Sequence, residues 1–320
     1  MNKKDLGLLS LIIVVGIVVA ILNPRFLLPI NISNTANLVG LFGISAIGQA
    51  LVIVTGGIEL SVGSVVALIG VLFIDLVATE GVPWPLAVLI MLILGVLIGL
   101  AHGWLITKVK LQPFIVTLCG LLIYRGIARF YTQDATAGFG FGQNFPALNW
   151  LTIGRSFGVP HSFIAMLIIG VIMWVVLHRS VFGRHLFAVG KNEEAALYSG
   201  IRTHRVIIWA YVICQVLTAI AAMYFAMYTG SVTPASQGNF YELYAIAAAV
   251  LGGFSLRGGE GSIVGVILGV VLLQELQNLV NLLGIPSSLN FAVMGGVILI
   301  GVTADQQWGH IRGRLRFLRS

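Results

Sequence analysis

Charged residues are scarce in this sequence, at 9% of 320 residues, whereas 58% are hydrophobic. Soluble domains carry about 25% charged residues, so this chain has too few charges to cover a surface that faces water. Its apolar stretches run continuously for roughly 20 residues, whereas barrel strands would alternate. The sequence therefore predicts an all-α polytopic membrane protein. We expect one transmembrane domain over residues 1–320, with a short basic tail at 305–320.

Cysteine is also scarce, since the chain has only Cys119 and Cys214. Two separated cysteines form neither a disulfide framework nor a metal site. Both fall inside predicted spans and are interpreted as packing residues. We expect no bound metal.

Catalytic motifs are missing as well. The sequence has no HExxH and no GxSxG. A Walker A motif needs four residues between its glycines, but six separate Gly183 from Gly190, and Asn192 stands where Ser or Thr is required. The chain is therefore predicted not to be an enzyme and to hold no cofactor. Any ATP and Mg²⁺ on which it depends would be bound by a partner.

Ten apolar segments are candidate membrane spans. At 1.5 Å per residue, all but the short eighth can cross about 30 Å of hydrocarbon. The predicted spans are 7–22, 36–54, 62–79, 84–106, 113–131, 161–178, 207–228, 243–255, 262–283 and 288–304.

The net charge of +7 is explained by topology rather than by nucleic-acid binding. With the N-terminus inside, the loops 107–112 and 179–206 and the C-terminal tail also lie inside, and the loop 132–160 lies outside. Positive residues concentrate in the inner segments, as the positive-inside rule requires. They are Lys3, Lys4, Lys108, Lys110, Arg179, Arg184, Lys191, Arg202, Arg205, Arg312, Arg314, Arg316 and Arg319.

Two glycine-interrupted segments echo each other. Residues 50–72 and 247–273 both read as an apolar run, Gly-Gly, a polar turn with Glu, Gly-Ser and a second apolar run. Interrupted segments at corresponding places in two halves of a chain point to a transport site, although glycine-rich turns can also resemble each other by chance. The first segment contributes Gly56, Gly57, Glu59, Ser61 and Gly63; the second contributes Gly252, Gly253, Gly258, Gly259 and Glu260.

Glu59 is the most unusual residue of the first segment, because a carboxylate at membrane depth is expensive. It has two interpretations. It is either a structural carboxylate that accepts hydrogen bonds from the first N–H groups of the third span, with Ser61 and Ser64 as further caps, or a residue that touches solute or gates a pathway.

The ninth span carries a polar face. Gln274, Asn278 and Asn281 follow the i, i+4, i+7 spacing of one helix face. Such a face, with Gln49 on the second span, suits a neutral polyhydroxylated solute. The alternative is hydrogen bonding between helices or subunits.

The inner loop 179–206 contains a short helix candidate. Glu residues at its start suit the helix dipole, and Gly200 suits its end. It is either a plain surface helix or a docking helix for a cytoplasmic partner. The residues of interest are Arg184, Asn192, Glu193, Glu194, Ala195, Ala196 and Gly200.

The pattern of Glu194-Ala195-Ala196 followed by Gly200 resembles the loop of ABC importer permeases that contacts the ATPase. The strings "GRHLFAVGKNEEAALYSGI", "GGIELSVGS", "QPFIVTL" and "AIAAAVLGGFSLRGGEGSIVG" are similar to the ribose/arabinose/xylose-type sugar permeases, over about residues 30–300. Glu59 stands where that family usually has Asp, and His102 where it often has Asn.

The resemblance implies a permease subunit of an ABC importer that moves a small sugar-like solute by ATP-driven alternating access. It also implies a separate ATPase subunit, an extracytoplasmic solute-binding protein, a second permease subunit (identical or not) and a bacterial inner membrane. The alternative is a secondary transporter coupled to an ion gradient, which would need a proton relay such as Glu59 with His102 or Glu260.

Overall fold

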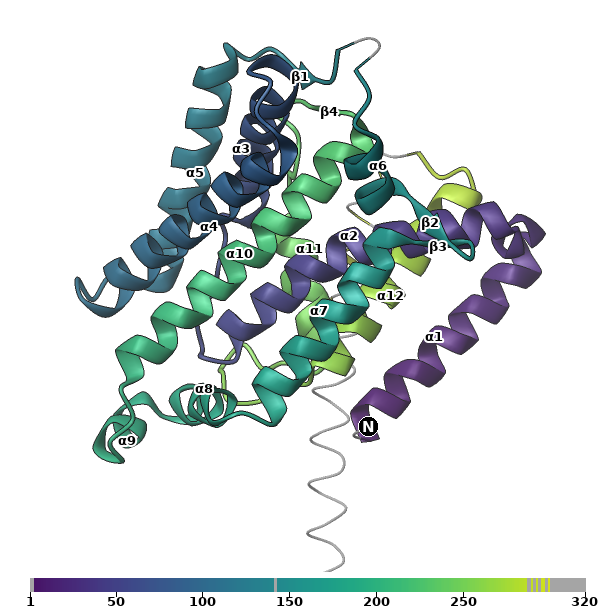
Figure 1. Cartoon of the computed structure of the whole chain (residues 1–320). Helices are drawn as coiled ribbons and strands as arrows, with labels where there is room; N and C mark the ends of the chain where they lie inside the picture. The colour runs from purple at the N-terminus through teal and green to yellow at the C-terminus, as the bar shows by residue number, and fades with distance from the viewer. Residues whose placement is uncertain are drawn as a thin grey trace, which may run out of the picture.

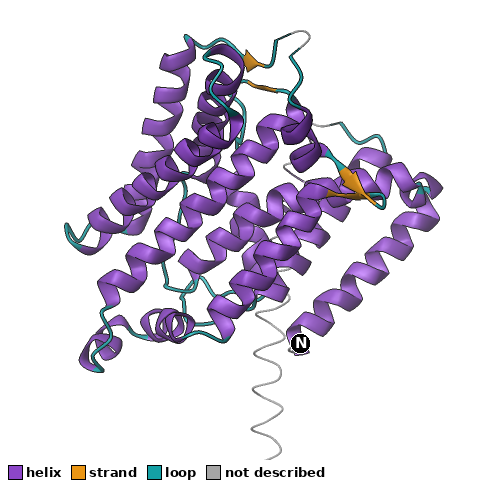
Figure 2. Cartoon of the chain, in the orientation of Figure 1, coloured by secondary structure: helices purple, strands orange, loops and turns teal. Residues whose placement is uncertain are grey.

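The computed structural model describes residues 3–140 and 143–286, together with Leu289, Ala292, Gly295, Gly296 and Leu299. Helices dominate this part of the chain, and eight of them are long and apolar enough to cross a membrane (Figure 2). The long helices are α1 (Lys3–Leu22), α2 (Pro29–Ile53), α3 (Val62–Ile74) with its π-helical extension η2 (Asp75–Thr79), α4 (Trp84–Thr107), α5 (Pro113–Thr132), α7 (His161–His178), α10 (Thr203–Thr229) and α12 (Ile263–Leu282).

These eight helices confirm eight of the ten predicted spans. The predicted span 243–255 is α11 (Tyr241–Leu251), which has 11 residues and reaches only about 16 Å, too short to cross a membrane. The predicted span 288–304 falls largely outside the described residues, as does the tail 305–320 entirely.

The second helix begins seven residues before the predicted start at 36. Pro29 occupies its first turn, where the fixed φ of proline is already helical. The polar residues that follow read as a loop in the sequence, but Asn31 forms a side-chain hydrogen bond with Asn278 of α12. Because α12 supplies a hydrogen-bond partner, the polar residues after Pro29 can form part of α2.

The core is built around α2 and α10. Their apolar windows are 83% and 72% buried, whereas that of α1 is 17% buried. Figure 1 shows α2, α7 and α10 running side by side through the bundle and α1 standing at its edge. The centre of the protein is therefore formed by residues far apart in the sequence.

The two ends of the bundle differ. One carries the short helices α8 (Val181–Lys191) and α9 (Glu193–Tyr198) and the start of α1 (Figure 1). The other carries α6 (Pro146–Ile153) and two small antiparallel ladders. The ladder of β1 (Ala137–Gly138) with β4 (Ser231–Val232) ties the segment after α5 to the segment after α10, and β2 (Arg155–Ser156) pairs with β3 (Val159–Pro160).

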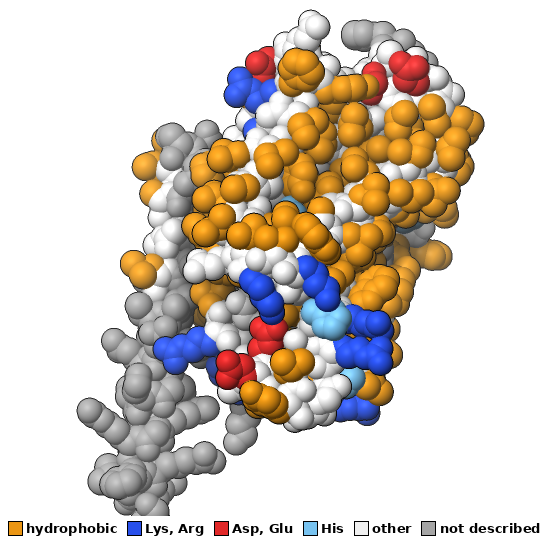
Figure 3. All heavy atoms as spheres, turned by 90° about the vertical axis from the view of Figure 1, so that its left-hand side faces the viewer, with side chains coloured by type: hydrophobic (Ala, Val, Ile, Leu, Met, Phe, Trp, Pro, Cys, Tyr) orange, Lys and Arg blue, Asp and Glu red, His pale blue; other side chains and the backbone are white. Residues whose placement is uncertain are grey.

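Between these ends lies a broad apolar belt. On the face that presents α4 and α5, hydrophobic side chains cover the middle, and Lys and Arg side chains gather below (Figure 3). Such a belt bounded by charge is the surface expected of a membrane-spanning protein.

Main chain lies directly against main chain at several places, of which two are described first. Cβ atoms on Gly252, Gly265 or Gly269 would overlap the backbone of the facing helix, so α11 and α12 pack closely. The second place is the start of α3, where a Cβ on Gly63 would overlap the carbonyl oxygen of Gly238. The segment before α11 therefore reaches the start of α3.

Candidate functional site

Glu59 lies in the loop between α2 and α3 and is completely buried. Its Oε1 accepts hydrogen bonds from the backbone N–H of Ser61 at 2.8 Å and from the Ser61 hydroxyl at 2.7 Å. Glu59 thus fixes Ser61, the residue directly before α3. The expected capping by Ser61 and Ser64 is wrong, because the Ser61 hydroxyl donates to Glu59 and the Ser64 hydroxyl has no partner in the part of the chain that the structure describes.

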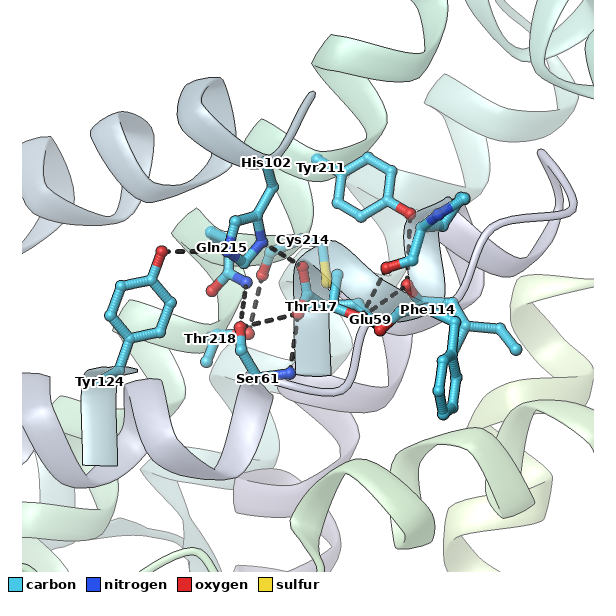
Figure 4. Close-up of polar contacts among 12 residues, drawn as sticks. Glu59, Ser61, His102, Phe114, Thr117, Tyr124, Tyr211, Cys214, Gln215 and Thr218 are labelled. Atoms are coloured by element: carbon cyan, nitrogen blue, oxygen red, sulfur yellow. Dashed lines mark hydrogen bonds and ion pairs between the residues drawn. The ribbon is translucent and has the colours of Figure 1, made fainter. Parts of the chain in front are cut away.

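The other carboxylate oxygen of Glu59 faces His102 of α4. Nδ1 of His102 lies 2.8 Å from Oε2, and Nε2 lies 3.0 Å from the hydroxyl of Tyr124 on α5. Figure 4 shows these side chains pointing toward one another from separate elements. A carboxylate only accepts, so Nδ1 donates to Glu59. The row of Glu59, His102 and Tyr124, called the buried relay here, connects the α2–α3 loop to α4 and α5.

The same loop also has hydrogen-bond partners on α5 and α10. The carbonyl oxygen of Ile58 accepts from the hydroxyl of Tyr211 at 3.2 Å and from that of Thr117 at 3.3 Å. Nε2 of Gln215 donates to the Ser61 hydroxyl at 3.2 Å (Figure 4). Non-helical backbone at this depth needs such partners, so α5 and α10 hold the loop in place.

The second glycine turn, residues 252–262, meets the first. The N–H of Gly259 donates to the carbonyl oxygen of Val54 at 2.8 Å. Glu260 lies at the edge of the contact, where Nζ of Lys191 donates to its Oε1 at 2.7 Å. This pair holds the pKa of the Glu260 carboxyl below its ordinary value. The two segments that echo each other in the sequence are thus in direct contact.

The polar positions of α12 and α2 are placed differently from one another. Nδ2 of Asn278 donates to Thr35 and to Asn31, so this residue joins α12 to α2. Asn281 is exposed. Gln49 and Gln274 are buried, and neither amide atom of Gln49 nor the Oε1 of Gln274 has a partner within the described residues.

Gln274 borders a small cavity between α2, α11 and α12. Phe42 and Tyr244 line it, together with alanine and aliphatic side chains. The two rings are 5.9 Å apart between centroids and meet edge to face. The cavity has a volume of about 10 Å³, which is room for about one water molecule, so a larger ligand would fit between Phe42, Tyr244 and Gln274 only if the helices moved apart.

The inner-loop helix is present as predicted. It forms α9, whose N-cap Asn192 accepts from the N–H of Ala195 at 2.9 Å. Glu193 and Glu194 occupy the first turn, Ala196 is buried against the bundle, and Gly200 ends the segment with a φ of +84°. Arg184 lies on α8 and is exposed. The role of this surface in docking stays a prediction.

Sequence reasoning missed several residues of this site. Gln215 and Tyr211 on α10 are two of them, and both are fully buried. The signal in the sequence is a glutamine within a long apolar span. Arg125 on α5 also belongs to this site, because its guanidinium donates to the carbonyl oxygens of Pro234 and Gln237, both at 2.7 Å. It therefore holds the segment that reaches the start of α3.

Comparison with known proteins gives concordant results. Residues 31–302 match the family model described as branched-chain amino acid transport system / permease component. The chain is 43% identical to the ribose import permease protein of Bacillus subtilis (strain 168), over 94% of this chain and 91% of that protein. It is 38% identical to the ribose import permease protein of Escherichia coli (strain K12), over 96% and 94%.

A further relative is named for a different solute. The chain is 33% identical to the autoinducer 2 import system permease protein of Escherichia coli O9:H4 (strain HS), over 93% of this chain and 90% of that protein. No solved structure matches the chain.

Proposed function

Because this chain belongs to the family of branched-chain amino acid transport system permease components and is a permease subunit of an ABC importer, we propose that its solute is a neutral monosaccharide of the ribose class. The observation that carries the proposal is the similarity to two ribose import permeases along almost the whole of each chain. Among the described residues, the buried side-chain atoms without a partner belong to the amides of Gln and the hydroxyls of Ser, apart from one carboxylate oxygen of Glu275. The amides and hydroxyls suit sugar hydroxyls without adding net charge.

The proposed partners follow from the two ends of the bundle. A separate ATPase subunit docks on α8 and α9 and hydrolyses ATP with its own Mg²⁺. An extracytoplasmic solute-binding protein delivers the sugar at the opposite end, near β1 and α6. With α8, α9 and both termini on the cytoplasmic side, Lys108, Lys110, Arg202 and Arg205 around His204 follow the positive-inside rule. The membrane is then the inner membrane of a bacterium.

A second permease subunit completes the assembly in this proposal. The outer face of α5 is apolar and exposed, and it includes Leu122, Ile123 and Ile127. Its opposite face carries Tyr124, which is part of the buried relay, and Thr117, which contacts the loop that holds Glu59. We place α5 beside the second subunit, where a shift of the helix would reach the loop that holds Glu59.

The proposed pathway uses the unpaired groups. Gln49 and Gln274 carry hydrogen-bonding atoms that the structure leaves without partners, and buried polar groups are normally paired. A sugar entering between α2, α11 and α12 would supply the missing partners as the helices separate, with Phe42 and Tyr244 facing the ring. We place Glu59 as a brace at the start of α3 rather than in sugar binding, because both of its carboxylate oxygens are already hydrogen-bonded, one to Ser61 and the other to His102.

The test begins with the chain purified from native membranes in mild detergent and its partners identified by mass spectrometry. We expect an ATPase with a Walker motif that is lost when Glu194 and Gly200 are replaced. Proteoliposomes of the complex with its binding protein should then take up labelled D-ribose only when ATP is available to the ATPase. Unlabelled autoinducer-2 as competitor separates the two solutes named for the relatives.

The rival function gives a different outcome. A secondary transporter would take up solute on an imposed pH or sodium gradient with no ATPase present. Glu59→Gln would then abolish gradient-driven uptake, whereas an ABC permease remains indifferent to the gradient. Uptake by a preparation without ATPase would contradict the proposal.

A further inference from the structure

The end of α8 makes an unusual contact with both glycine turns at once. Val54, at the end of α2, accepts a hydrogen bond from Gly259. Gly190, one residue before the end of α8, lies against both: a Cβ on Gly190 would overlap the Val54 carbonyl oxygen and the Gly259 nitrogen. Three segments from distant parts of the sequence therefore meet through their main chains.

Glycine is required at several positions of this contact. A Cβ on Gly258 would lie 2.7 Å from the nitrogen of Gly56 and 2.8 Å from the carbonyl oxygen of Gly190. Gly56 and Gly258 also have φ values of +81° and +84°, which favour glycine. We refer to Gly56, Gly190, Gly258 and Gly259, together with Val54, as the glycine junction.

An ion pair borders the junction. Lys191 follows Gly190, and its Nζ lies 2.7 Å from Oε1 of Glu260, the residue after Gly259. The two side chains are 61% and 58% exposed. The pair therefore links α8 to the second turn from the outside and can be altered without disturbing the buried packing.

The two ends of α8 are held differently. Near its start, a Cβ on Gly183 would overlap the carbonyl oxygen of Leu177, so this end is fixed to α7. Its far end forms the junction and continues directly through Asn192 into α9. A displacement of α9 would therefore turn α8 about its start and move Gly190.

The junction lies close to the buried relay. Only five positions separate Val54 from Glu59, and Glu59 contacts His102, which contacts Tyr124 of α5. On the other side, Gly258 and Gly259 precede α12, which carries Gln274. Side chains can absorb a displacement by changing rotamer, whereas glycine backbones in contact cannot.

We propose that the glycine junction transmits the movement of α8 and α9 to both turns simultaneously, and that Gly190 is the positioning residue for this transmission. The proposal rests on the proposed function, since it takes a docked ATPase as the source of movement. In this proposal the movement reaches the end of α2 and the start of α12 directly. It does not pass along a membrane helix such as α7 or α10.

The main test uses Gly190→Ala in the complete complex with ATPase and binding protein. ATP hydrolysis and labelled D-ribose uptake are measured on the same proteoliposomes. We expect the complex to assemble and hydrolyse ATP while the ribose taken up per ATP falls about tenfold, within the range of ordinary coupling effects. Gly7→Ala on α1 is the matched control, because a Cβ there meets nothing within 4 Å.

A second pair of variants guards against misfolding of Gly190→Ala. Lys191→Glu and Glu260→Lys change exposed side chains, so both proteins should fold and assemble. Each is expected to lower the ribose taken up per ATP, and the double variant with exchanged charges should restore it. A purely structural role would instead lower assembly, hydrolysis and uptake together.

Each outcome decides one proposal. An unchanged ratio of ribose to ATP in Gly190→Ala, or exchanged charges that fail to restore uptake, would overturn the role of the junction while leaving the importer intact. A wild-type chain that binds no ATPase would overturn the proposed function itself.

Discussion

The carboxylate of Glu59 lies 2.8 Å from the imidazole of His102, although 43 positions separate them in the sequence. Neither side chain is more than 2% exposed. A buried ionisable pair of this kind is tolerated only when its remaining hydrogen-bonding atoms are also satisfied. Ser61 supplies this for Glu59, and Tyr124 supplies it for His102.

Replacing Glu59 should therefore separate the role of its charge from that of its hydrogen bonds. Glu59→Ala leaves His102 and the N–H of Ser61 without an acceptor, and we expect a loss of about 3–5 kcal/mol in the free energy of unfolding. Glu59→Gln keeps an acceptor oxygen and should lose about 1–3 kcal/mol. Unfolding of the detergent-purified chain measures both. Equal losses would show that the acceptor oxygens of Glu59 do not hold Ser61 and the start of α3.

Tyr124 should be energetically coupled to Glu59 through His102. Tyr124→Phe removes one hydroxyl and is expected to cost about 0.5–1.5 kcal/mol. In a double-mutant cycle with Glu59→Gln, a coupling of at least about 0.5 kcal/mol is expected for residues in one network. Additive losses would mean that the three side chains do not act together.

The contact of Gly63 with Gly238 should not tolerate a methyl group. Gly63→Ala forces the start of α3 away from the Gly238 carbonyl, and overpacking of this kind costs about 1–3 kcal/mol. Gly126→Ala on α5 is the control, since a Cβ there meets nothing within 4 Å and alanine favours a helix. The measurement is the unfolding midpoint of each variant. Equal midpoints would contradict the close contact.

Arg125 should hold the segment before α11 in its observed conformation. Its two hydrogen bonds, to Pro234 and Gln237, use one guanidinium nitrogen. Arg125→Lys shortens the side chain and removes the planar fork, so faster hydrogen exchange is expected at the backbone amides of residues 235–241. The exposed Arg155→Lys serves as control. Unchanged exchange in Arg125→Lys would contradict this assignment.

Substitutions at Asn278 and at Gln274 should have different effects, although both residues lie on α12. Asn278→Leu loses its bonds to Asn31 and Thr35, and we expect about 0.6–2 kcal/mol of destabilisation with normal ribose uptake per assembled complex. Gln274→Leu removes an amide without a partner at its Oε1, so stability should hold while the KM for ribose rises. A changed KM for ribose in Asn278→Leu would indicate that Asn278 also contacts the solute.

Local features were predictable from the sequence. The helix α9 is specified by neighbouring residues alone, with Asn192 at its start and Gly200 at its end, and both occupy the expected positions. The membrane helices follow equally from continuous apolar runs. Of the nine predicted spans within the described residues, eight are helices long enough to cross a membrane, and only 243–255 is not.

Non-local features were not predictable. Nothing near Glu59 in the sequence shows that His102 and Tyr124 will meet it, because the contact depends on how α4 and α5 pack. The start of α2 was missed for the same reason, since its polar first turns depend on Asn278.

The meeting of Gly63 and Gly238 has a consequence for how such proteins diversify. Where two stretches of main chain press against each other, the contact depends on the absence of side chains rather than on their identity. Phe42, Tyr244 and Gln274 line a separate cavity, so substitutions there leave the main-chain contact in place. If these positions select the solute, as we propose, solute preference can change while the start of α3 stays fixed.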